Sequence, residues 1–331
     1  MSLFVFFLFV VLGSIAPAQA AALEVATPFA TSNQNPLVSI YGLPPAASAT
    51  VLAPGMTGIE LRADVASLCS REERNSETLL LDGETYRFTL VLKHGIGRRF
   101  EAGLEVPYVM HREGLLDNFI IGWHDFFNLP QGGRDEMPRR RLAYAYERNG
   151  ELAVDLDDET EGLGDLRLSL GWQLLRPQGD NPHALALRTS IKLPTGNDER
   201  LLGSGSTDIA FRLSGSQTFR QGSLALFGAA GGLFMSEGDV LPDQQQHAVA
   251  FGTLGAGWKP LSDLALKVQI DGHTPFYRGS DLRGLSQSLQ LSMGGSLALT
   301  QSLVLDVAVS EDIVVDSAPD VVFHFALRRT F

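Results

Sequence analysis

Residues 264–271, Leu-Ala-Leu-Lys-Val-Gln-Ile-Asp, alternate large apolar side chains with polar or small ones. Because successive side chains of a β-strand point to opposite faces, this stretch predicts a strand with one apolar face and one polar face. The same alternation recurs through most of the remaining chain. It therefore decides the fold class.

About twelve segments of roughly ten residues carry this pattern, and ten residues is the length that a tilted strand needs to cross a bilayer. They lie near residues 57–66, 85–94, 99–110, 164–175, 184–193, 208–219, 222–234, 247–258, 263–272, 287–298, 302–310 and 320–331. An even number of strands lets both ends of the barrel sequence emerge on one side.

The connections between these segments alternate between short and long. The long ones lie around residues 67–84, 111–163, 194–207, 235–246, 273–286 and 311–319. Short turns on one side and long loops on the other are typical of outer-membrane barrels, in which the short turns are periplasmic. We therefore expect an all-β protein, a transmembrane antiparallel β-barrel of about 12 strands over residues 57–331, with short periplasmic turns and long extracellular loops.

A secreted β-sandwich is the competing fold, because it alternates in the same way but buries its apolar faces inward. The loop asymmetry and the aromatic residues near the predicted strand ends, Trp172 and Trp258 among them, favour the barrel.

Composition excludes several other classes of protein. The chain has 331 residues and a formal net charge of −12, which argues against nucleic acid as a partner. A single cysteine, Cys69, excludes an intramolecular disulfide framework and a cysteine-based zinc site. We expect no cofactor and no metal.

Residues 1–20 resemble a secretory signal peptide, with an apolar run followed by Ala18-Gln19-Ala20 before the expected cleavage site. This predicts export through a cleaved signal to the outer membrane of a Gram-negative cell. Residues 21–56 are rich in Pro, Ala, Ser and Thr and show no periodicity. They are expected either to remain periplasmic or to thread into the lumen.

The last segment resembles the C-terminal assembly signal of Gram-negative outer-membrane proteins, which implies the barrel-assembly machinery as a partner. The residues that carry this resemblance are Phe323, Phe325, Leu327 and Phe331.

If the apolar faces meet lipid, the opposite faces line the lumen with charges of both signs. The predicted lumen-lining residues are Arg62, Arg87, Lys93, Glu101, Glu105, Arg167, Arg188, Lys192, Arg212, Lys267 and Asp271. Such a set can serve solute selectivity, or it can be a structural network that fills a narrow barrel.

The connection over 111–163 is long enough to carry structure of its own. An amphipathic helix is predicted near 115–129, as a lid, a plug or an element on the outer leaflet, with the apolar residues Leu116, Phe119, Ile120, Trp123, Phe126 and Phe127. The basic run 139–141 can pair with phosphates of lipopolysaccharide or remain solvated. Residues 141–146 and 151–156 are expected to form a projecting hairpin around Asn149-Gly150.

Three motifs resemble the outer-membrane proteins of the phenol MetA-pathway transporter type. They are Gly-Leu-Gly-Asp-Leu at 162–166, Lys-Leu-Pro-Thr-Gly at 192–196 and Leu-Gly-Ser-Gly-Ser-Thr-Asp at 202–208. Asn-Pro-Leu at 35–37 and Tyr-Gly-Leu-Pro at 41–44, together with Arg134-Asp135 and residues 139–146, resemble a related barrel family of unknown function. The glycine-rich 203–207 is a weak candidate for a phosphate cradle, because no Gly-Lys-Ser/Thr follows it.

These features favour a passive channel or transporter for small, apolar or aromatic molecules, with outer-membrane lipid and a small-molecule solute as partners. A lipid-acting barrel hydrolase is one alternative, for which His124-Asp125 is the best candidate pair. A structural or adhesive surface protein is another. We expect no catalytic residues.

Overall fold

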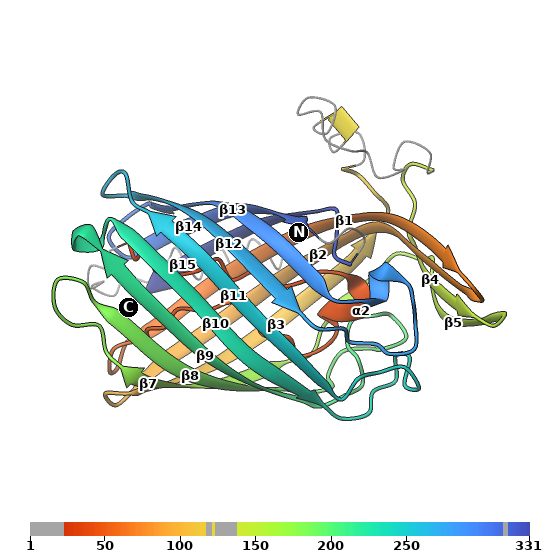
Figure 1. The fold of residues 1–331 in the computed structure, drawn as a ribbon, viewed down its shortest axis with the longest axis horizontal. Coiled ribbons are helices and arrows are strands. Elements are labelled where there is room, and N and C mark those ends of the chain that lie inside the picture. Colours follow the sequence, from red (N-terminus) through yellow and green to blue (C-terminus); the bar gives the residue numbers. More distant parts are fainter. Residues whose placement is uncertain (1–22, 117–120, 123–137, 314–316) are drawn as a thin grey trace.

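In the computed structural model, which describes residues 23–116, 121–122, 138–313 and 317–331, the chain forms one closed antiparallel β-barrel (Figure 1). The strands are β1 (Thr57–Arg74), β2 (Glu77–Ile96), β3 (Phe100–Arg112), β4 (Ala143–Arg148), β5 (Glu151–Leu156), β6 (Thr160–Leu163), β7 (Arg167–Leu175), β8 (His183–Lys192), β9 (Asp208–Phe219), β10 (Leu224–Met235), β11 (Ala248–Trp258), β12 (Leu264–His273), β13 (Ser288–Ala298), β14 (Leu303–Asp312) and β15 (Val321–Thr330). The helices in this part of the chain are α2 (Pro36–Ser39) and two 3₁₀ turns, η2 (Arg220–Gly222) and η3 (Arg283–Leu285), and residues 121–122 are also helical.

Twelve of these strands close the barrel, as the alternation predicted. Each of β7 to β15 pairs with its sequence neighbour, β15 pairs with β1, and β1, β2, β3 and β7 complete the ring. Thr57 and Phe331 exchange backbone hydrogen bonds of 3.1 and 2.9 Å where the first and last strands meet. No helix in the described ranges is long and apolar enough to cross a membrane.

The apolar rows of the strands point outward. Side chains at alternate positions are 38–72% exposed on the bare protein, and they include Leu168, Leu170, Trp172, Ile209, Phe211, Leu254, Leu266, Val268, Ile270, Met293, Val307 and Phe325. Their polar neighbours are buried, as Lys267 at 3% and Gln269 at 1% show. A β-sandwich would bury the apolar rows and expose the polar ones. The outer surface of this barrel is therefore matched to hydrocarbon rather than to water.

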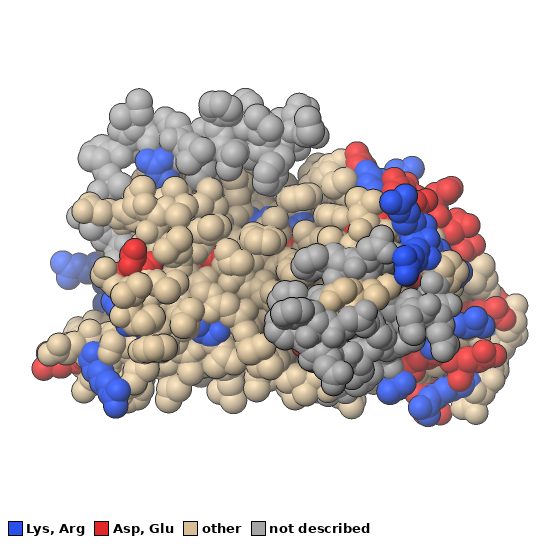
Figure 2. Space-filling view, turned by 90° about the horizontal axis from the view of Figure 1, so that it is seen from above, with Lys and Arg blue, Asp and Glu red and all other residues tan. Residues whose placement is uncertain are grey.

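Charged residues on the outer surface are unevenly distributed along the barrel axis. In Figure 2, Lys, Arg, Asp and Glu gather mainly over the end that carries β4 and β5, and the wall behind them is mostly uncharged. We call this end the long-loop end. The opposite end, with the connections 97–99, 176–182, 220–223, 259–263 and 299–302, is the short-turn end.

The predicted long loop over 67–84 is wrong. β1 and β2 continue to Arg74 and Glu77 and meet in a tight turn, in which Asn75 adopts a φ of 54°. The outer part of β2 pairs with β1 on one side and with β4 of the β4–β5 hairpin on the other, so β5, β4, β2 and β1 form a sheet that projects beyond the barrel (Figure 1). The predicted hairpin around Asn149-Gly150 is confirmed.

Candidate functional site: a plugged lumen

Residues 23–54 lie inside the barrel, and we call them the plug. They run from the short-turn end along β12 to the long-loop end, turn through α2, and return along β9, β8 and β7 to β1. Most side chains of the plug are buried. Side chains of the barrel wall bind the plug by hydrogen bonds, and the plug does not pair with the wall as a β-strand.

The ascending arm of the plug, residues 23–34, follows β12 at a constant sequence offset. The backbone N–H of Phe29 donates to Gln269 at 3.0 Å, and the hydroxyl of Thr31 donates to Asp271 at 2.8 Å. Two residues further on, Asn33 contacts His273 at 2.9 Å. Because inward side chains of a strand recur every second residue, this polar row makes a matching row of alternate contacts with an extended arm.

The turn of the plug sits in an apolar core at the long-loop end. Asn35 caps α2 by accepting a hydrogen bond from the N–H of Leu37 at 3.0 Å, and Pro36 at the first position has no N–H to satisfy. The Tyr41 ring stacks on Phe276 with centroids 5.2 Å apart, and Tyr277 donates to the carbonyl of Leu37 at 2.7 Å. Burial raises the pKa of both tyrosines well above the ordinary value, so both rings stay neutral and can remain in the core.

The descending arm, residues 43–54, is held by guanidinium groups. Arg167 on β7 donates to the carbonyl of Leu43 at 3.1 Å, and Arg188 on β8 donates to the carbonyl of Thr50 at 3.0 Å. Arg212 on β9 donates to the carbonyl of Pro45. Gln173 binds the arm twice, accepting from the N–H of Val51 and donating to the carbonyl of Ala49, both at 2.8 Å.

The three sequence motifs meet in one cluster around Lys192. Its ammonium lies 2.5 Å from Asp165, 3.4 Å from Asp208 and 2.6 Å from the hydroxyl of Ser204. The lysine and both carboxylates are almost fully buried. The motifs therefore join the start of β7, the end of β8 and the start of β9 at the long-loop end.

This cluster also fixes the plug and explains the glycine-rich loop. The N–H of Gly42 donates to Asp208 at 2.6 Å, and a Cβ at Gly42 would lie only 2.7 Å from the Cβ of Asp208. The N–H groups of Thr195 and Gly196 donate to Asp165 at 2.9 and 2.7 Å, and the N–H of Ser204 in the glycine-rich 203–207 donates to the same carboxylate at 3.3 Å. The glycine-rich loop thus contacts the Asp165 carboxylate, where the sequence alone left a phosphate as an alternative.

The other residues predicted to line the lumen also have their side chains inside the barrel. Ion pairs join Arg62 to Glu60 at 2.6 Å, Arg167 to Glu105 at 2.9 Å and Arg188 to Glu101 at 3.5 Å. Arg87 donates to the carbonyl of Ser39 at 3.0 Å, and Lys267 donates to that of Thr27 at 2.9 Å. Two further pairs add to the network: His324 with Asp64 at 2.6 Å and Arg328 with Asp306 at 2.9 Å.

Some predicted features fall outside the described residues. The predicted helix over 115–129 includes Phe119, Ile120, Trp123, His124, Asp125, Phe126 and Phe127, none of which the structure describes. Leu116 is described, and its N–H donates to Glu84 at 2.5 Å. The signal peptide over 1–20 also lies outside the described ranges. Phe323, Phe325 and Leu327 lie on the outward row of β15.

The acidic stretch over residues 155–161 contributes ion pairs. Arg112 pairs with Glu159 at 3.2 Å and also with Glu161. Within the described ranges, no group of three or more His, Cys, Asp or Glu side chains is placed to hold a metal ion.

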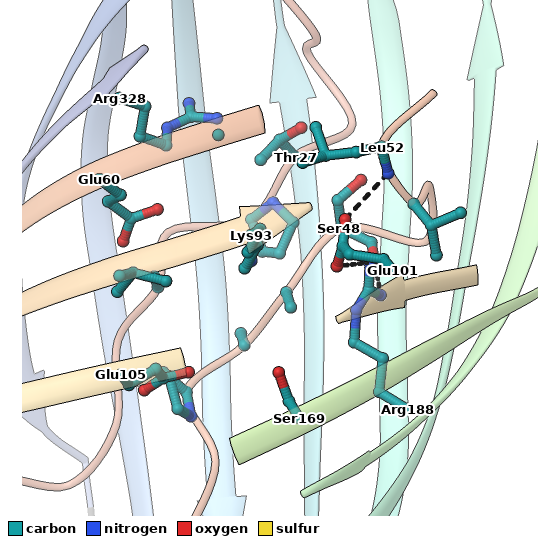
Figure 3. Close-up of a pocket in the computed structure, with 18 of the residues that line it drawn as sticks. Thr27, Ser48, Leu52, Glu60, Lys93, Glu101, Glu105, Ser169, Arg188 and Arg328 are labelled. Carbon is teal, nitrogen blue, oxygen red and sulfur yellow. Dashed lines mark hydrogen bonds and ion pairs between the residues drawn. The ribbon is translucent and has the colours of Figure 1, made fainter. Parts of the chain in front are cut away.

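A cavity of about 400 Å³ remains between the two arms of the plug and the wall. Gly58, Ser302 and Thr330 line it, which places it in the short-turn half of the barrel. Figure 3 shows Lys93 near the middle of this cavity, with Glu60, Glu101 and Arg188 around it. The size is that of a pocket for a small molecule.

Solved structures with similar folds are outer-membrane proteins. The COG4313 outer membrane channel from Pseudomonas putida F1 aligns over 85% of this chain and 97% of its own, at 13% identity and a TM-score of 0.57. The KdgM porin aligns over 83% of this chain and 99% of its own, at 8% identity and a TM-score of 0.44. The Ralstonia pickettii toluene transporter TbuX aligns over 85% of this chain and 90% of its own, at 12% identity and a TM-score of 0.39. The first likeness establishes a shared fold.

No curated protein gives a significant match to the chain. A family model described as a protein of unknown function, DUF3187, matches residues 5–331, and the chain therefore belongs to the DUF3187 family.

Proposed function

We propose that this protein is an outer-membrane channel for small molecules whose lumen is closed at rest by its own N-terminal plug. The observation that carries the proposal is the combination of an outward apolar belt with a lumen filled by a segment outside the strand ladder. The three motifs that resemble the phenol MetA-pathway transporter type support a transport role. The barrel wall would sit in outer-membrane lipid and admit a solute through its axis.

The contacts of the plug suit a removable obstruction. Arg167, Arg188 and Arg212 donate to backbone carbonyls of the descending arm, and water in an opened lumen can replace each such bond. The bonds that close the barrel wall are separate from these, so the descending arm can leave without opening the wall.

A reversible cross-link tests this proposal. A Cβ at Gly171 would lie 3.2 Å from Cγ1 of Val51. The Cβ of one cysteine and the sulfur of the other are roughly 3 Å apart in a disulfide. Val51→Cys with Gly171→Cys, in a Cys69→Ser background, would therefore lock the descending arm to β7.

Single-channel recording in planar bilayers gives the readout. The oxidised double variant should conduct at least tenfold less often than its reduced form, and each single-cysteine variant should not respond to reduction. Equal conductance of the oxidised and reduced forms would contradict gating by this arm. If the full chain and a variant without residues 23–52 both fail to pass any solute, the channel function is wrong.

A further inference from the structure

The cavity in the short-turn half of the lumen has a surplus of positive charge. Six inward-facing Lys and Arg side chains line it against five carboxylates, although the whole chain carries a net charge of −12. Four of these carboxylates already have guanidinium partners: Glu60, Glu101, Glu105 and Asp306 bind Arg62, Arg188, Arg167 and Arg328. Of these six cations, Lys93 and Arg212 form no ion pair within the described ranges.

Lys93 is the clearest of these cations. No hydrogen bond or ion pair within 4 Å joins its ammonium to any part of the chain that the structure describes. Its cross-strand neighbours are both glycines, Gly58 on β1 and Gly103 on β3. Ser169 and Leu52 fill the space beside these glycines, 2.5 and 3.3 Å from where a Cβ would stand at Gly103 and Gly58, and Lys93 itself lines the cavity (Figure 3).

The arginines of the same cavity have unused hydrogen-bond donors. The Nε–H groups of Arg167, Arg188 and Arg212 are buried and have no acceptor in the described ranges. Arg188 and Arg212 also face each other directly across β8 and β9. Like charges opposite each other destabilise a sheet, and buried donors without acceptors cost free energy, so both features favour an anion between these strands.

The plug forms the other wall of the cavity, which is mainly apolar but includes Glu24, Thr27, Ser48 and Thr50. The plug contributes small and aliphatic side chains there, including Leu23, Ala46, Val51 and Leu52. A ligand that fits both walls has an anionic group for Lys93 and the guanidinium groups, and an apolar body for the plug.

We infer that this cavity binds a small organic carboxylate with an apolar body, and that Lys93 is its principal cationic contact. This deepens the proposed channel function by naming the chemical class of the solute. Arg188 and Arg212 bind the plug as well as facing the cavity, so Lys93 is the residue whose change isolates ligand binding.

A titration with 4-fluorobenzoate tests the inference on the full chain in an uncharged detergent, with ¹⁹F NMR as the readout. Two further probes separate the parts of the ligand: 4-fluorobenzyl alcohol keeps the body without the charge, and fluoroacetate keeps the charge with almost no body. We expect saturable binding of the benzoate at least tenfold tighter than that of either other probe. Equal affinity of either other probe overturns the inference.

Variants localise the binding. Lys93→Gln should weaken benzoate binding roughly tenfold, because a charge-assisted hydrogen bond is lost. Lys93→Arg should stay within about threefold of wild type. Arg98→Gln, an exposed cation in the turn between β2 and β3, is the matched control and should change nothing. Unchanged binding by Lys93→Gln, or an equal loss in Arg98→Gln, overturns the assignment.

Binding and permeation can fail separately. The titration needs no transport, so benzoate binding by a barrel that never conducts would remove the proposed function and keep the site. Conductance without benzoate binding would keep the channel and remove the site.

Discussion

An arginine at mid-height of the outward face tests which side of the barrel meets lipid. Val268 lies in the middle of β12 and is 42% exposed on the bare protein, between Leu266 and Ile270 on the same face. Arginine at the bilayer midplane of a transmembrane barrel costs about 2–4 kcal/mol of folding free energy. An exposed site on a water-soluble protein would change by only about 0.5 kcal/mol.

The same strand supplies the depth control. Leu264 lies four residues before Val268 on the same face. At about 3.4 Å per residue and a strand tilt of about 40°, it is displaced by about 10 Å along the membrane normal. This is close to the edge of an apolar band about 25 Å tall, where arginine costs about 0–1 kcal/mol.

Equilibrium unfolding in phospholipid vesicles measures both values. Val268→Arg should lose about 1–4 kcal/mol more than Leu264→Arg, and Val268→Ala corrects for the lost apolar side chain. Equal losses at the two depths would refute the argument that this face lies in hydrocarbon.

Three further predictions concern the long-loop end. Lys192→Met leaves Asp165 and Asp208 buried without their cation and should cost about 3–5 kcal/mol in the same unfolding assay; a loss below about 1 kcal/mol would show that the cluster is not buried. Gly42→Val places a Cβ against Asp208 and should raise single-channel open probability by displacing the plug, whereas an unchanged probability would contradict this contact. Burial, and then the hydrogen bond to Glu77, raise the pKa of Tyr146 to about 12. Folding favours the neutral phenol of Tyr146, so the stabilising effect of its burial is complete below about pH 10 and is lost as pH rises through about 12. In a titration followed by absorbance at 295 nm, Tyr146→Phe should therefore lack one tyrosine that ionises at high pH. Identical titration curves for wild type and Tyr146→Phe would disprove the assignment.

The wall of the barrel could be predicted from the sequence because its signal is local. Each strand meets lipid on one face and a polar interior on the other, so Leu266, Val268 and Ile270 alternate with Lys267 and Gln269 whatever the neighbouring strands do. The predicted loop over 67–84 failed for the same reason. Beyond the membrane both faces of β1 and β2 leave the lipid, and residues such as Glu72 and Arg74 no longer follow an apolar and polar alternation.

The plug and the Lys192 cluster depend on information that a local pattern lacks. Asp165, Lys192 and Asp208 meet only because β7, β8 and β9 pair in one particular register. The sequence marked them as motifs at strand ends, but their spacing does not reveal that one lysine joins two carboxylates. The plug has no periodicity because wall side chains, such as Gln173 and Gln269, satisfy its backbone in place of a ladder.

The turn of the plug and its descending arm are held by different forces, and this predicts the order in which they release. Residues 37–43 place Leu37, Ile40 and Tyr41 in the apolar core of the long-loop end. Exposing each such side chain costs about 1.5–3 kcal/mol.

Over residues 44–51 the descending arm contains mainly Pro, Ala, Ser and Thr. Its carbonyls hold it to the wall, and water can replace each of these bonds at a net cost of only about 0.5–1.5 kcal/mol. The descending arm should therefore open first, next to the cavity that it lines. Amide hydrogen exchange measures this order directly: the N–H of Val51 should exchange at least tenfold faster than that of Tyr41. Equal protection of the two would mean that the plug leaves as one unit, and a faster Tyr41 would mean that the apolar end opens before the guanidinium-bound one.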